Sequence, residues 1–155
     1  MEGPMDLRIQ PYVPARLFTV HEADALVPRL AEIFNRMDPK LVRLKELEDL
    51  LEDAESYWGS KGETMPPEER EGYERLIEER DETRALLDED IQEISTLGCE
   101  LKDLHSGLVD FPAPVDNTLA YLCWQRGERK IANWHPLEGG FAGRRPLRMG
   151  PQAER

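Results

Sequence analysis

The chain has 155 residues, the length of a single domain, and its composition excludes several classes of function. Acidic residues outnumber basic ones by 32 to 20, and a net charge of −12 repels phosphate backbones, so we expect no nucleic-acid partner. Two cysteines form neither a disulfide framework nor a zinc pattern, no apolar run approaches the roughly 18 residues of a membrane span, and the start lacks the regions of a signal peptide. We therefore expect a cytoplasmic protein without a membrane partner.

Residues 1–17 carry three prolines among scattered apolar residues and are expected to form an extended arm. A helix is predicted from Thr19 to about Trp58, because apolar residues recur there at alternating spacings of three and four. This heptad seam consists of Ala23, Leu26, Leu30, Ile33, Met37, Leu44, Leu47, Leu51, Ala54 and Trp58. Thr19 and Glu22 have the spacing of a capping box, which gives the helix a defined start.

Two prolines fall inside this predicted helix. Pro28 should kink it, because the ring removes a backbone donor and crowds the preceding turn. Asp38-Pro39 is a second weak point, because a residue before proline resists helical angles, so one helix could instead be two.

A second helix is predicted to begin at Pro66-Pro67, after a loop that contains Gly62. Prolines and then acids suit the first turn of a helix, and Gly98 suits the left-handed residue that ends one. The apolar stripe of this helix consists of Tyr73, Ile77, Leu87, Ile91, Ile94 and Leu97. The two helices are therefore expected to form a long antiparallel, coiled-coil-like hairpin over residues 18–97.

Folding the hairpin about Gly62 places Lys40 near Arg84, so the middle of the seam is polar. Two interpretations are open: a solvated, loosely packed waist, or a pair of cations that binds an anion.

The first helix also carries Val27, Phe34 and Leu41, seven residues apart, which widen its apolar stripe. One partner helix cannot cover both this flank and the seam. We therefore expect a homodimer in which two hairpins form a four-helix arrangement, and we expect Phe34→Glu to dissociate it.

After Gly98 the hydrophobic period changes from helical to alternating, which predicts strands. The predicted strands are 99–103, 108–112, 119–125 and 130–135. Gly127-Glu128 has the sequence of a two-residue type II′ hairpin turn between the last two strands. The fold class is thus α+β: the helical hairpin, then a small antiparallel meander with a closing loop over 98–147, and a frayed tail over 148–155.

The predicted turn pairs Trp124 with Ile131 and Cys123 with Ala132. Because side chains alternate across a strand, His135 then shares the apolar, helix-facing side of Trp124, whereas Cys123 lies on the other side. A nucleophile–base pair of Cys123 and His135 needs hydrogen-bond reach and is therefore not expected.

Asp110, Glu128, His135 and Arg144 are polar residues that the meander brings towards one end of the sheet. They are the candidate ligand-binding residues. In the predicted register Asp110 and His135 point to different faces, so a shared pocket requires the glycine-rich closing loop to wrap over an edge. The alternative is that these groups only pin that loop.

Several motifs of the chain stand in an order that is typical of one family. They are Phe18-Thr19-x-x-Glu22-Ala23, Gly98-x-x-x-Lys102-Asp103, Gly107-Leu108-Val109-Asp110-Phe111-Pro112, Leu122-Cys123-Trp124-x-x-Gly127-Glu128, Trp134-His135 and Gly140-Phe141-x-Gly143-Arg144-x-Pro146-Leu147. As a set they resemble the bacterial proteins grouped as domain of unknown function 2203. The resemblance implies no activity, but it implies a family pattern that includes Lys102, Asp103, Asp110, Glu128, His135 and Arg144.

We expect a protein-interaction or scaffold module that acts as a homodimer through its helical hairpin. The alternative is a small-molecule or metal-binding protein, or an enzyme, with a polar site at the sheet end. The sequence assigns no catalytic residue, no metal ligand and no cofactor. A thermal-shift screen of ligands and metals separates the two functions, because a binder of the native state raises apparent stability.

Overall fold

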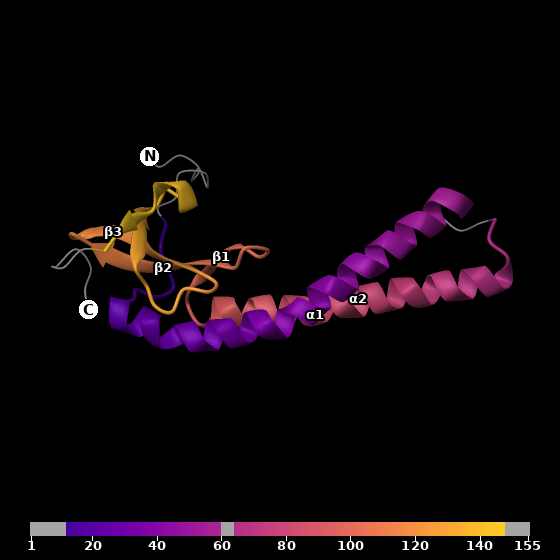
Figure 1. The fold of residues 1–155 in the computed structure, drawn as a ribbon, viewed down its shortest axis with the longest axis horizontal. Coiled ribbons are helices and arrows are strands. Elements are labelled where there is room, and N and C mark those ends of the chain that lie inside the picture. Colours follow the sequence, from indigo (N-terminus) through magenta and orange to yellow (C-terminus); the bar gives the residue numbers. More distant parts are fainter. Residues whose placement is uncertain (1–11, 60–63, 148–155) are drawn as a thin grey trace, which may run out of the picture.

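Two long helices and one sheet make up the computed structural model, which describes residues 12–59 and 64–147. Helices α1 (Val20–Trp58) and α2 (Pro67–Thr96) lie antiparallel, and the sheet lies at the end of this hairpin away from the helix connection (Figure 1). This arrangement confirms the predicted α+β fold. No helix within the described ranges has an apolar stretch long enough to cross a membrane.

Some sequence predictions concern residues outside the described ranges. These are the first part of the expected extended arm (residues 1–11), the middle of the helix connection (60–63) and the expected frayed tail (148–155).

The capping box at the start of α1 is confirmed. The Glu22 backbone N–H donates to Thr19 Oγ1 at 3.1 Å, and the Thr19 N–H donates to the Glu22 carboxylate at 2.9 Å. Pro28 and Pro39 both lie inside α1, so the helix is not divided at Asp38-Pro39. Figure 1 shows α1 bending along its length, as expected for a helix that has lost ladder hydrogen bonds at interior prolines.

Replacing the cap residue should weaken the whole fold, because α1 carries much of the core. We expect Thr19→Ala to lower the free energy of unfolding by about 1 kcal/mol. Chemical denaturation measures the change, and Thr118→Ala, at an exposed threonine that begins a strand, is the control with little expected effect. Equal unfolding midpoints for Thr19→Ala and the wild type would contradict the role of the cap.

Ion pairs occupy the middle of the hairpin. Arg36 Nε lies 2.8 Å from the carboxylate of the buried Asp90, and Lys40 binds the same carboxylate. Burial raises the pKa of Asp90, but the hydrogen bonds from Lys40 and Arg36 lower it by more than burial raises it. The pKa of this carboxyl is therefore below its usual value. Arg84 pairs instead with Glu48 at 3.3 Å. Lys40 and Arg84 each have a carboxylate partner, so the interpretation of this waist as an anion site has no support.

Five antiparallel strands follow the hairpin and pair in chain order. They are β1 (Glu100–Asp103), β2 (Leu108–Val115), β3 (Thr118–Gln125), β4 (Asn133–Pro136) and β5 (Arg145–Pro146). The first three lie where alternation predicted strands, β4 begins at Asn133 rather than at the predicted Lys130, and the two-residue β5 was not predicted. A short 3₁₀ helix, η2 (Phe141–Gly143), lies in the closing loop between β4 and β5.

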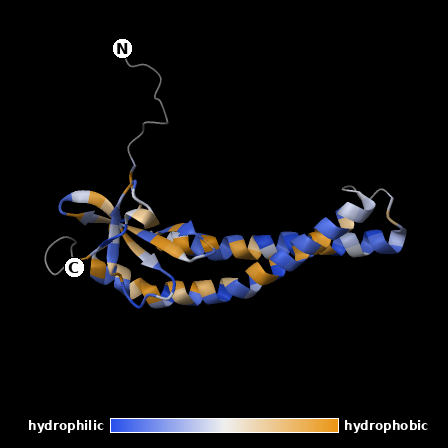
Figure 2. Ribbon diagram, turned by 45° about the horizontal axis from the view of Figure 1, so that its top comes forward, coloured by the Kyte–Doolittle hydropathy of each residue, from blue (hydrophilic) through white to orange (hydrophobic). Residues whose placement is uncertain are grey.

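One face of the sheet packs on α1 and forms the core. The Phe34 ring lies 6.1 Å from the Trp124 ring, and the Phe18 ring contacts Phe111 edge-on at 5.1 Å. Figure 2 shows the hydrophobic residues of the helices concentrated in the half of the hairpin near the sheet. Val27 and Phe34 are only 6% and 1% exposed. Val27 and Phe34 of the flank that the sequence argument assigned to a second copy of the chain are therefore covered within one chain, whereas Leu41, its third residue, stays partly exposed.

The predicted turn between β3 and β4 is wrong by one residue. The turn closes around Arg126-Gly127, where the Glu128 N–H donates to the Gln125 carbonyl at 3.0 Å, and Gly127 supplies the positive φ of 104°. The chain then continues through residues 126–132 before β4 begins, so no two-residue hairpin forms.

Contacts with α1 and β5 hold this longer connection in place. The Ile131 N–H donates to Asp24 Oδ1 of α1 at 2.6 Å, and the Leu147 N–H donates to the Ala132 carbonyl at 2.9 Å. Cys123 therefore pairs with Asn133 rather than with Ala132, and Tyr121 pairs with His135. A shift of one residue moves every side chain of a strand to the other face, so His135 lies on the face of Cys123 and not on the helix-facing side.

Candidate functional site

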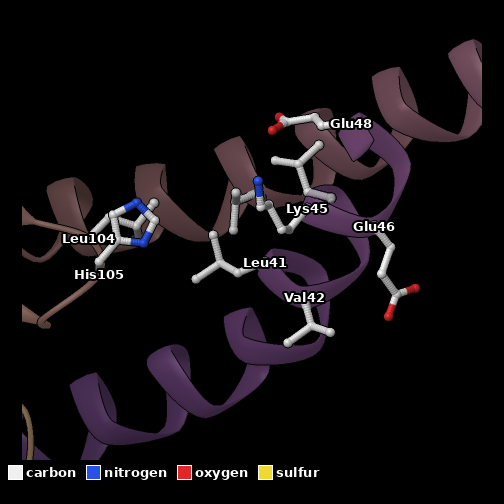
Figure 3. A pocket seen from close by; sticks show the side chains of 9 residues that line it. Leu41, Val42, Lys45, Glu46, Glu48, Leu104 and His105 are labelled. Carbon is white, nitrogen blue, oxygen red and sulfur yellow. The ribbon is translucent and has the colours of Figure 1, made fainter. Parts of the chain in front are cut away.

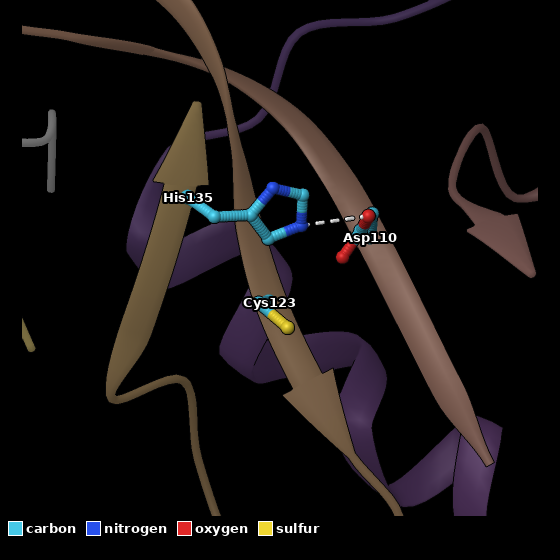
Figure 4. Close-up of side chains that lie close together, drawn as sticks. All are labelled: Asp110, Cys123 and His135. Carbon is cyan, nitrogen blue, oxygen red and sulfur yellow. Dashed lines mark hydrogen bonds and ion pairs between the residues drawn. The ribbon is translucent and has the colours of Figure 1, made fainter. Parts of the chain in front are cut away.

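The sheet face turned away from α1 carries three buried residues with reactive side chains. Asp110, Cys123 and His135 come from β2, β3 and β4 and are at most 1% exposed. Asp110 is the direct ladder partner of Cys123, and His135 pairs with Tyr121, two residues before Cys123. Figure 4 shows the three side chains converging, and their ligand atoms all lie within 4.8 Å of one another. The sequence prediction that Cys123 and Asp110 lie opposite His135 is therefore wrong.

The His135 ring is held at both nitrogens. Nδ1 lies 2.7 Å from the Pro136 carbonyl oxygen, and Nε2 lies 2.9 Å from Asp110 Oδ2. A carbonyl oxygen only accepts, so Nδ1 carries a proton. Nε2 faces a carboxylate oxygen, so a further proton must lie between Nε2 and Oδ2, on the ring or on the carboxyl group. Two buried acceptor atoms thus share one proton.

Burial dominates the electrostatics of this cluster. Burial raises the pKa of the Asp110 carboxyl, although His135 and Lys102 oppose the shift. Burial also raises the pKa of the Cys123 thiol to about 11, which Arg144 offsets only in part. Cys123 is therefore a neutral thiol at pH 7 and not an activated nucleophile. Asp110 Oδ1 is buried and makes no hydrogen bond of ordinary geometry with the described residues, although the neighbouring Cys123 thiol interacts with the carboxyl and lowers its pKa.

Glu128 and Arg144 form a separate pair beside the cluster. Arg144 Nη2 lies 2.7 Å from Glu128 Oε1 and 3.3 Å from the Cys123 carbonyl oxygen. The Glu128 carboxylate also accepts the Gln125 N–H at 2.7 Å. This pair joins the closing loop to the end of β3. The structure thus places the four predicted site residues as two pairs, both next to Cys123.

Aromatic and charged side chains continue the polar face towards β1. The Tyr121 ring lies 5.4 Å from the His135 ring, and its hydroxyl donates to Glu100 at 2.9 Å. Lys102 also binds Glu100, and its ammonium lies 4.7 Å from the centre of the Tyr121 ring. Tyr12, from the arm before α1, donates to the same carboxylate. This layer borders the cluster on the β1 side.

A groove at the waist of the hairpin is a second candidate site. It has a volume of about 630 Å³ and lies where the helices leave the sheet (Figure 3). Its walls come from α1, α2 and the turn after β1, and the lining residues are Leu41, Val42, Leu44, Lys45, Glu46, Glu48, Leu87, Leu104 and His105. Among these lining residues, Val42 is 61% exposed. Apolar surface is therefore open to solvent at this point.

Comparison with known proteins identifies one family. A family model described as "Uncharacterized conserved protein (DUF2203)" matches residues 16–147. The match spans both helices, all five strands and every polar residue of the candidate sites except Tyr12, and it confirms the resemblance inferred from the motifs. No curated protein and no solved structure matches the chain.

Proposed function

The chain belongs to the DUF2203 family, and we propose that it is a protein-interaction module that associates with a second copy of itself through the helical hairpin. The observation that carries this proposal is the open apolar groove at the hairpin waist. An open apolar groove of this size suits an apolar ridge of another helix. The net charge of −12 favours a protein over a nucleic acid as partner, and a cytoplasmic location is part of the same proposal.

The hairpin beyond the sheet supports the same function. In the described part of the chain, α1 and α2 pack on each other there, with Leu47, Leu51 and Met65 as the buried apolar residues. Most of a helix's stability in proteins comes from tertiary packing, and two helices alone provide little of it. A second hairpin would add a third and fourth helix over the groove.

A twofold contact is the arrangement that best suits this groove. Most soluble oligomers are closed and symmetric, and in a C2 dimer the same patch meets itself. Val42 would then enter the partner's groove while its own groove receives the partner's Val42. Glu128 and Arg144 take no part in this contact, and we assign them to fixing the closing loop.

The proposal predicts that an acid at the groove separates the two copies. Light scattering at micromolar concentration should give about twice the chain mass of 17.9 kDa for the wild type and the chain mass for Val42→Asp. Val42 is exposed in one chain, so the substitution should leave the fold intact.

Leu137→Asp is the matched control. Leu137 is, like Val42, an exposed aliphatic residue (37% exposed), but it lies after β4 and does not line the groove. It should keep the doubled mass. A wild-type monomer over the same range, or equal dissociation by both variants, would contradict the proposal.

A further inference from the structure

We propose that Asp110, Cys123 and His135 form a site for one divalent transition-metal ion of the zinc class. This inference is independent of self-association, because the site lies on the outer face of the sheet and the groove lies at the hairpin waist.

The placement of the three side chains is the first argument. They come from three adjacent strands, and Figure 4 shows them directed towards a common centre. Zinc binds sulfur at about 2.3 Å and nitrogen or oxygen at about 2.0–2.2 Å, so ligand atoms around one ion lie roughly 3–4 Å apart. The three ligand atoms here lie within 4.8 Å of one another, so small side-chain rotations bring them to one ion.

The hydrogen bonding of His135 is the second argument. Metal-binding histidines usually donate the other ring N–H to a carbonyl or carboxylate, which fixes the ring and its tautomer. His135 has this arrangement, because its Nδ1 lies 2.7 Å from the Pro136 carbonyl oxygen. It leaves the Nε2 lone pair directed at Asp110 Oδ2, and a metal ion can take the place of the proton that these two atoms otherwise share.

The unpaired oxygen of Asp110 is the third argument, and it is independent of the second. A purely structural Asp–His pair accounts for Oδ2 and Nε2. It leaves Oδ1 buried, with no hydrogen bond of ordinary geometry among the described residues and only the weak thiol donor of Cys123 beside the carboxyl. A cation at the centre of the cluster interacts with both carboxylate oxygens and with the buried Cys123 sulfur.

The donor set selects the kind of metal. One thiolate, one imidazole and one carboxylate suit zinc, cobalt and related ions, whereas magnesium and calcium take oxygen ligands. Three protein ligands leave a fourth position for water or another ligand, as in zinc sites that are not purely structural. Metal binding requires loss of the thiol proton, which the charge of the ion favours.

Cobalt titration of the chelator-treated full chain tests the site directly. We expect one Co²⁺ per chain, with the visible bands of tetrahedral cobalt and a thiolate-to-cobalt charge-transfer band, both removed by Zn²⁺ and unaffected by Mg²⁺. No cobalt spectrum, or displacement of cobalt by Mg²⁺, would overturn the proposal.

A pair of cysteine variants identifies the sulfur ligand. Cys123→Ser should lose the charge-transfer band and weaken cobalt binding on the order of tenfold or more. Cys99→Ser should keep both properties, and it is a matched control because Cys99 is also a buried, free cysteine whose pKa burial raises to about 11. A band that survives Cys123→Ser, or that is lost with Cys99→Ser, would overturn the assignment.

Thiol labelling of the wild type decides the question without any variant, should Cys123→Ser fail to fold. Peptide mapping after alkylation should show that Zn²⁺ slows labelling of Cys123 at least tenfold more than labelling of Cys99, which is also buried and is slowed only through the overall stabilisation of the fold. Equal protection of both cysteines, or of neither, would overturn the site.

Discussion

Phe34→Glu is expected to unfold the protein rather than to release a folded monomer. Phe34 is 1% exposed and packs against Trp124 under the sheet, so the new carboxylate would be buried in the core without a partner. We expect a loss of more than about 4 kcal/mol, a large part of the stability of a typical domain. Circular dichroism in the near and far ultraviolet, followed through a thermal melt, measures this change.

Phe141→Glu is the matched control, because Phe141 is 50% exposed in the closing loop. It should melt close to the wild-type temperature. A folded, monomeric Phe34→Glu protein would contradict the packing described above and would restore the flank of Val27 and Phe34 as a dimer interface.

His135→Ala is expected to cost about 3–5 kcal/mol in the metal-free protein. Removing one partner of a buried pair leaves the other without compensation, and the Asp110 carboxyl is 1% exposed. Denaturant unfolding in the presence of a chelator measures the loss. His21→Ala, at an exposed position near the start of α1, should change stability by less than about 0.5 kcal/mol.

A double-mutant cycle separates this pair from its surroundings. Asp110→Ala combined with His135→Ala should cost less than the sum of the single changes, because the second change removes the group that the first leaves unpaired. Simple additivity would mean that the 2.9 Å contact of Nε2 with Oδ2 contributes nothing to stability.

The helices could be predicted because their signals are local. Apolar spacing along α1, the Thr19–Glu22 capping box and the positive φ of Gly98 each depend on residues within a few positions of one another. The structure confirms the long helix α1, its capping box and the positive φ of Gly98. The interior Pro39 is the exception: tertiary packing keeps α1 continuous where the dipeptide Asp38-Pro39 favoured a break.

The register of β4 could not be predicted, because a long-range contact decides it. The bond from the Ile131 N–H to Asp24 joins residues that are 107 positions apart, and it extends the connection beyond the tight turn that Gly127-Glu128 favoured. The single-residue shift moved His135 to the other face. Asp110 and Cys123 were correctly predicted on one face. Only the wrong register of β4 kept the sequence analysis from bringing His135 to them.

The segment that covers the α1 flank could not be predicted from the sequence either. The spacing of Val27 and Phe34 shows that this flank needs an apolar partner, but not which segment provides it. Phe111, Leu122 and Trp124 of the sheet do so within the same chain. The proposed dimer therefore depends on the groove at Val42, which Leu41 of the flank also lines, and not on Val27 and Phe34.

X-ray absorption at the zinc edge of the wild-type protein tests the central claim, the metal site of Asp110, Cys123 and His135, most directly. After loading and desalting, we expect one zinc per chain with one sulfur at about 2.3 Å and nitrogen or oxygen ligands at about 2.0–2.2 Å. A coordination sphere without sulfur, or a protein that loses all zinc on desalting, would contradict it.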